Sequence, residues 1–144
     1  MQRRQLLLAG AAALALPPIR ARAQAPSDGP VLVIGHAGVP RVDVHTVARL
    51  YTGRAIEAGQ VTVSVLHLPV GHPLRTRFLA ACLQTDEERY RAYWTVRRHV
   101  GKGAPPRELA SLAEMLDLVG RTPGAVGYID AASATPGLNV ICRL

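Results

Sequence analysis

Apolar residues follow two patterns along the chain, one typical of strands and one typical of helices. A continuous apolar run at residues 31–34 predicts a buried strand, and a β-branched, alternating segment at 61–68 predicts a second one. Shorter apolar segments predict further strands at 125–129 and 139–144. Glycine and proline gather at 101–106, where we expect a loop.

Between the predicted strands, apolar residues recur at helical spacing, and typical start and stop residues border these segments. Asp43 can cap the first helix and Gly53 can end it, while Pro73 suits the start of the second. Two capping boxes, Thr85–Glu88 and Ser111–Glu114, predict the starts of two more helices. Because helices separate the strands, we expect an α/β fold with a largely parallel sheet flanked by helices.

The first 23 residues have the three parts of an export signal. Arg3 and Arg4 lead, an apolar run follows at 6–16, and a small-x-small site ends at Ala23. The run of 11 residues is too short to cross a bilayer as a helix, which needs ~20 residues. The paired arginines resemble a twin-arginine signal, and the general secretory route is the alternative. We therefore expect cleavage after Ala23 and a protein of the periplasm.

The excess positive charge of the chain lies largely in this signal. The formal net charge of all 144 residues is +7, which by itself suggests a nucleic-acid partner. Cleavage removes four arginines and no acidic residue, so 13 basic and 10 acidic side chains remain, with a net charge of +3. Arg97 and Arg98 are expected on a solvated helix face, and no basic patch interleaves with aromatic residues. We therefore expect no nucleic-acid partner, and we divide the chain into the signal at 1–23, a flexible leader at 24–30 and one α/β domain at 31–144.

Four segments resemble motifs of one known family, and they occur in the order that the family requires. Thr122–Tyr128 (TPGAVGY) is similar to the family segment "pGaIGYv", and Leu50–Gly53 (LYTG) is similar to "iF.G". Arg75–Phe78 is similar to the start of a Phe-containing helix, and Tyr93–Trp94 resembles an aromatic pair in the helix that follows. Across about residues 31–130, the chain thus resembles the phosphate-binding proteins of ABC transporters, which have the type 2 periplasmic binding protein fold.

This resemblance implies a non-enzymatic solute-binding protein whose ligand is phosphate or another small oxyanion, with no cofactor. Family members have two lobes that close on the ligand, whereas the expected domain has the length of one lobe. A single-lobe relative would form a homodimer, pair with a membrane transporter or sensor component, or bind its ligand openly. No nucleophile elbow or glycine-rich phosphate loop points to catalysis. An interaction-only accessory domain is the alternative within the same fold.

The ligand site that the resemblance implies lies beyond the carboxyl ends of the strands. Candidate ligand-binding residues there are Gly38, Gly71, His72 and Arg75. The family begins its Phe-containing helix with Ser-Gly-Thr, where hydroxyls and backbone N–H groups meet phosphate, but this chain has His-Pro-Leu at that place. Cationic His72 and Arg75 would have to supply the missing interactions.

Three histidines suggest an alternative function as a periplasmic metal-binding protein. His36 follows the first predicted strand, His67 ends the second, and His72 lies in the loop after it. If the first two strands are neighbours, the three side chains can converge and bind zinc or copper. The two cysteines, Cys82 and Cys142, lie in predicted apolar elements. They are either a disulfide pair, which an oxidising compartment allows, or two buried free thiols.

Overall fold

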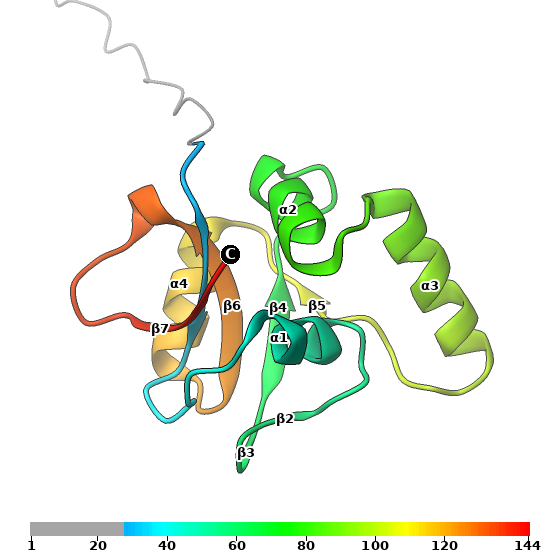
Figure 1. Ribbon diagram of the computed structural model, residues 1–144, viewed down its shortest axis with the longest axis horizontal. Coiled ribbons are helices and arrows are strands. Elements are labelled where there is room, and N and C mark those ends of the chain that lie inside the picture. Colours follow the sequence, from blue (N-terminus) through cyan, green and yellow to red (C-terminus); the bar gives the residue numbers. More distant parts are fainter. Residues whose placement is uncertain (1–27) are drawn as a thin grey trace, which may run out of the picture.

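A five-stranded sheet lies at the centre of the structure, a computed structural model that describes residues 28–144 (Figure 1). The strands follow the order β5-β4-β6-β1-β7 across the sheet. Their bounds are Val31–Gly35 for β1, Ser64–His67 for β4, Arg107–Glu108 for β5, Ala125–Asp130 for β6 and Asn139–Arg143 for β7. A separate hairpin pairs β2, Glu57–Ala58, with β3, Val61–Thr62.

One strand of the main sheet, β1, runs antiparallel to all the others. β4 pairs in parallel with β5 and β6, whereas β1 pairs antiparallel with both of its neighbours, β6 and β7. Four of the five strands therefore run in one direction, which confirms the expected α/β fold with a largely parallel sheet. Helices lie in the connection from β4 to β5 and in the return from β5 to β6, which places β5 and β6 on either side of β4, and each parallel pairing needs such a long crossover. The reversed direction of β1 is not contained in the sequence pattern, and it decides which loops meet at each edge of the sheet.

Helices cover both faces of the sheet. They are α1 (Val44–Tyr51), α2 (Pro73–Phe78), the π-helix η1 (Leu79–Leu83), α3 (Glu87–His99), α4 (Leu112–Arg121) and the short 3-10 helix η2 (Ala131–Ser133). Gly127 of β6 lies so close to Met115 of α4 that a Cβ at this position would collide with the sulfur. On the opposite face, Tyr128 stacks on Phe78 of α2 with ring centroids 4.1 Å apart. Figure 1 shows α3 at the side of the sheet, beyond β4 and β5.

The helix starts follow local hydrogen bonding, with one difference from the expected boxes. Asp43 accepts a hydrogen bond from the backbone of Thr46, and Ser111 Oγ accepts one from Glu114 N–H, as predicted. The box expected at Thr85–Glu88 is wrong, because Asp86 caps α3 through a bond from Arg89 N–H. In a capping box the Glu88 side chain would accept a hydrogen bond from Thr85 N–H. This N–H instead donates to the Leu79 carbonyl of the π-helix.

Two strand boundaries also differ from the prediction. The single strand expected at 61–68 is divided at Val63, because β3 pairs with β2 whereas β4 pairs with β6. β5, which was not among the predicted strands, follows directly after the loop expected at 101–106 and pairs with β4. Next to this pairing, Leu109 N–H donates to the His67 carbonyl. The strands expected near 31, 125 and 139 are confirmed as β1, β6 and β7.

The structure covers the expected domain but little of what precedes it. The expected export signal at 1–23 and the first leader positions, 24–27, lie outside the described residues. The last leader positions, 28–30, run directly into β1. Within residues 28–144, no helix has the length and apolar character that a membrane span requires.

Candidate functional site

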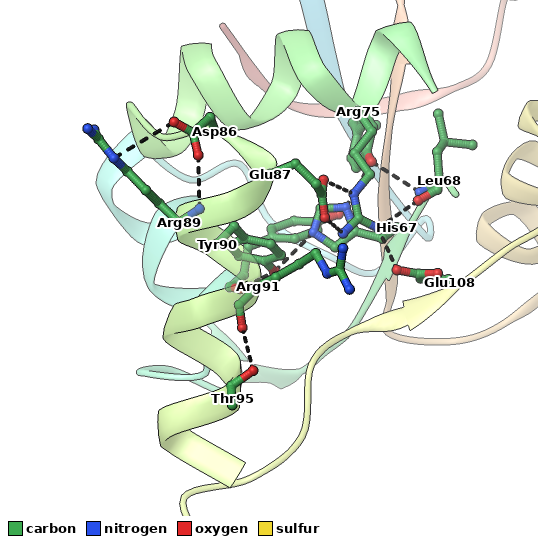
Figure 2. Close-up of polar contacts among 12 residues, drawn as sticks. His67, Leu68, Arg75, Asp86, Glu87, Arg89, Tyr90, Arg91, Thr95 and Glu108 are labelled. Carbon is green, nitrogen blue, oxygen red and sulfur yellow. Dashed lines mark hydrogen bonds and ion pairs between the residues drawn. The ribbon is translucent and has the colours of Figure 1, made fainter. Parts of the chain in front are cut away.

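The carboxyl ends of β4 and β5 form the sheet edge at which the sequence analysis places the ligand. His67 ends β4, residues 68–72 connect β4 to α2, and Glu108 ends β5. α3 lies against this edge and contributes Glu87 and Tyr90, so that four elements meet there (Figure 2).

Arg75, in the first turns of α2, is the central cation of this edge. Its side chain is buried, and its Nε and Nη2 donate to both oxygens of Glu87 at 2.8 and 2.7 Å. Nη1 donates to Glu108 Oε1 at 2.7 Å and to the Leu68 carbonyl at 2.9 Å. Burial opposes the charge, but the hydrogen bonds and charges of the two glutamates outweigh it and raise the pKa of Arg75 above its ordinary value.

These bonds define what Arg75 can do. A guanidinium has five N–H groups, and four of the groups of Arg75 are already engaged, two of them in a bidentate pair with Glu87. Arg75 therefore ties α2, α3 and β5 together, and only one of its N–H groups remains for a ligand. Two carboxylates beside one guanidinium leave this cluster with net negative charge, which does not favour an anion.

His67 lies in the core just behind the arginine and both of its ring nitrogens are engaged. Tyr128 Oη lies 2.8 Å from Nδ1 and Tyr90 Oη lies 3.0 Å from Nε2. Leu68 N–H donates to the Tyr128 hydroxyl, and the Tyr90 hydroxyl donates to the Tyr51 carbonyl. The Tyr90 hydroxyl gives its one proton to the Tyr51 carbonyl, so the nitrogen that faces it, Nε2, carries a proton and donates to Tyr90. In the neutral ring, Nδ1 then accepts from the Tyr128 hydroxyl.

The environment keeps His67 in this neutral form. Burial, and then the nearby charge of Arg75, lower the pKa of His67 from 6.5 to about 3. The imidazole is 1% exposed and lies edge-on to the rings of Tyr51, Phe78, Tyr90 and Tyr128, with centroids 5.0 to 5.7 Å away. A proton on Nδ1 would remove the hydrogen bond that this nitrogen accepts from the Tyr128 hydroxyl in the neutral ring.

The three candidate metal ligands do not converge. β1 is separated from β4 by β6 and runs in the opposite direction, so His36 lies where β6 begins, and its N–H donates to the Ala125 carbonyl. His67 lies at the other edge, with both nitrogens bonded to tyrosines. In the part of the chain that the structure describes, no three His, Cys, Asp or Glu side chains are grouped as metal ligands. The predicted cluster of His36, His67 and His72 is therefore wrong.

The reversal of β1 also divides the expected anion ligands. Gly38 lies in the turn after β1, at the edge opposite to Gly71, His72 and Arg75. Gly71 has a φ of 87°, a left-handed conformation that suits glycine in the turn before α2. His72 Nδ1 accepts a hydrogen bond from Leu74 N–H at 3.1 Å and so caps α2 in place of the family's hydroxyl residue. Only Gly71, His72 and Arg75 are therefore brought together.

Both cysteines are free thiols. Cys82 is buried in η1, where burial first, and the nearby Cys142 second, raise its pKa to about 12. Cys142 lies half-buried in β7, opposite Val33 of β1. The disulfide considered from the sequence is not formed in the structure.

A groove opens beside Arg75, and we call it the edge groove. It has a volume of about 250 Å³. Its lining consists of Val70, Arg75, Tyr90, Arg91, Trp94, Thr95, Arg98, Pro105 and Glu108. Arg91 and Arg98 are two turns apart on α3 and exposed, and among residues 28–144 neither forms an ion pair. In Figure 2, the side chain of Arg91 extends from α3 toward the strands.

The sequence analysis did not identify this groove. The sequence analysis expected Arg97 and Arg98 on a solvated helix face, and the structure buries Tyr90 and Trp94 of the same helix. The spacing of Arg91 and Arg98 places them on one helix face, but nothing in the pattern shows that the segment before β5 forms the opposite wall. That wall includes Pro105 from the segment expected to be a loop, followed by Glu108 of β5.

The fold is that of one part of known phosphate receptors. An ABC-type phosphate transport receptor from Vibrio cholerae is similar with a TM-score of 0.60 and 15% identity, over 78% of this chain and 45% of that chain. A chain described as a phosphate ABC transporter substrate-binding protein from Clostridium perfringens, solved with bound phosphate, is similar with a TM-score of 0.60 and 13% identity, over 78% of this chain and 44% of its own. The chain thus spans less than half the length of these receptors. No family model and no curated protein matches the sequence. The expected resemblance to a single lobe of a type 2 periplasmic binding protein is confirmed as a likeness of fold.

Proposed function

We propose that this chain is an exported, non-enzymatic solute-binding-like protein that binds a small oxyanion such as phosphate in the edge groove. The observation that carries the proposal is that Arg91 and Arg98, which form no ion pair within residues 28–144, lie on the α3 wall of a groove at the carboxyl edge of the sheet. The fold supports it, because the similar solved chains are phosphate receptors.

The charges around the groove favour a position of the anion near α3. The two negative charges of Glu87 and Glu108 exceed the single positive charge of Arg75, so these three side chains together do not attract an anion. Arg91 and Arg98 supply the surplus positive charge, and two guanidinium groups can meet a tetrahedral oxyanion with several N–H donors. Gly71 and His72 lie near this end of the sheet and stay candidates for further contacts through the loop that precedes α2.

An open groove predicts weak binding unless a second surface closes it. Association costs translational and rotational freedom, and a ligand that keeps much of its hydration gains little in return. A second copy of the chain, or a component of a membrane transporter or sensor, would supply the second wall that a two-lobed receptor carries in one chain. Measured affinity would then rise with protein concentration or on addition of that partner.

Calorimetry and thermal shift with phosphate and sulfate, at constant ionic strength, test the proposal. We expect binding that the single variants Arg91→Gln and Arg98→Gln weaken at least fivefold. The control Arg41→Gln removes the same charge from the segment after β1, at the opposite edge of the sheet. If neither anion produces heat or a thermal shift, the proposal that the chain binds a small oxyanion is wrong. The alternative, an interaction-only accessory domain, then stands. Cell fractionation, with Arg3 and Arg4 changed to lysine in a second strain, tests export to the periplasm.

A further inference from the structure

A second cavity lies away from the edge groove, between α1, the end of η1 and the start of α3. Its volume is about 400 Å³, which is within the range of small-molecule pockets. Side chains from all three elements line it, and apolar groups form most of its wall. We call it the cationic pocket, because His45, Arg49, Arg54 and Arg89 lie at its lining and no Asp or Glu does.

The aromatic wall of this pocket is held in place. The hydroxyl of Tyr93 donates to the Thr52 carbonyl at 2.6 Å, which fixes the ring between α3 and the end of α1. The Arg54 guanidinium lies 6.0 Å from the centroid of the same ring, and Arg49 donates to the Arg54 carbonyl. The ring and the cations are thus already arranged beside one another, so little ordering remains for a ligand to bring about.

The positive charge of the pocket is poorly neutralised by the protein itself. Among residues 28–144, Arg49 and Arg54 form no ion pair. Arg89 has one partner, Asp86, at 3.8 Å, and both of these side chains are more than half exposed. Such a pair contributes little and is easily exchanged for another anion.

The backbone next to the pocket has an uncommon conformation. Residues 79–83 form a π-helix, a type that is rare and often found at functional sites. Gln84, which ends it, has a φ of 50°, although it is not glycine. A left-handed conformation is strained in a residue other than glycine and persists where the surroundings require it. Cys82, Leu83 and Gln84 all line the cationic pocket, so this irregular turn shapes one of its walls.

From these observations we infer that the cationic pocket binds a small organic acid, a carboxylate that carries a flat or aliphatic apolar body. The carboxylate meets Arg49 and Arg54 with charge-assisted hydrogen bonds, and the apolar body packs on Leu83 and the Tyr93 ring. Inorganic phosphate does not match this pocket, because it has no apolar part to cover the wall. The ligand class therefore differs from that of the edge groove, and the inference does not depend on it.

Calorimetric titration of the purified chain tests this inference with four probes. Benzoate and hexanoate are expected to bind with one site per chain. Benzylamine, which has the same ring with the opposite charge, and phosphate are expected not to bind at this pocket. The double variant Arg49→Gln/Arg54→Gln is expected to weaken benzoate binding at least tenfold. Both arginines are exposed on the surface, so the variant is expected to fold, which its melting curve checks.

The control variant Arg91→Gln carries the same kind of change in the edge groove and is expected to leave benzoate binding unchanged. If neither acid binds, or if the double variant binds benzoate as tightly as the original chain, the inference is wrong. It is also wrong if sedimentation shows a dimer that the double variant abolishes, because the pocket is then covered by a second copy.

Discussion

The buried, neutral His67 predicts that the fold loses stability in mild acid. Lowering the pKa from 6.5 to about 3 corresponds to ~5 kcal/mol, since a tenfold change in acidity is worth about 1.4 kcal/mol. Between pH 6.5 and 3 the unfolded chain binds a proton at this site and the folded chain does not. The contribution of His67 to stability is therefore complete above pH 6.5 and decreases by ~1.4 kcal/mol for each pH unit below it.

Urea unfolding at several pH values between 7.5 and 4.5 measures this loss directly. In His67→Gln the amide can still accept from Tyr128 and donate to Tyr90, but it does not titrate. We expect the variant to be less stable than the original chain at pH 7.5, because the ring contacts with four aromatic side chains are lost. The difference should then shrink by ~1.4 kcal/mol per pH unit as the pH falls below 6.5.

Two further measurements separate this effect from general acid sensitivity. His45→Gln, which removes an exposed histidine on α1, is the control for the loss of a histidine as such. In NMR spectra of the folded protein, the His67 ring signals should not titrate above pH 4.5. Parallel stability curves for the original chain and His67→Gln, or a His67 midpoint near 6.5, would refute the reasoning.

Two more predictions concern the charged cluster and the thiols. Arg75→Met leaves the partly exposed Glu87 and Glu108 without their shared cation, so the free energy of unfolding should fall by about 1.5–3 kcal/mol, and adding Glu87→Gln and Glu108→Gln should restore part of it. A loss below 1 kcal/mol in urea titrations contradicts this account. In the native protein at pH 8, a thiol reagent should modify Cys142 well before Cys82, because burial raises the pKa of Cys82 to about 12 and leaves little thiolate. Equal rates would count against the buried position of Cys82.

Features that depend on neighbouring residues along the chain were predictable from the sequence. Alternating and continuous apolar segments identified the strands β1, β4, β6 and β7, and short polar side chains identified helix starts such as those at Asp43 and Ser111. These features follow from periodicity and from bonds between residues three or four positions apart, so no distant contact is needed to form them.

The candidate site was decided by contacts between distant parts of the chain. The pairing of β1 with β6 and β7 reversed its direction and carried His36 and Gly38 to the edge opposite His72. The sequence alone does not decide whether Arg75 binds an anion or pairs with glutamates of the same chain. The packing of α3 and β5 decides it, because it brings Glu87 and Glu108 to the guanidinium group. Strand direction and the choice among charge partners depend on free energies summed over the whole fold. For this reason the sequence by itself determined the elements and the fold class, while the tertiary structure alone decided which side chains form the site.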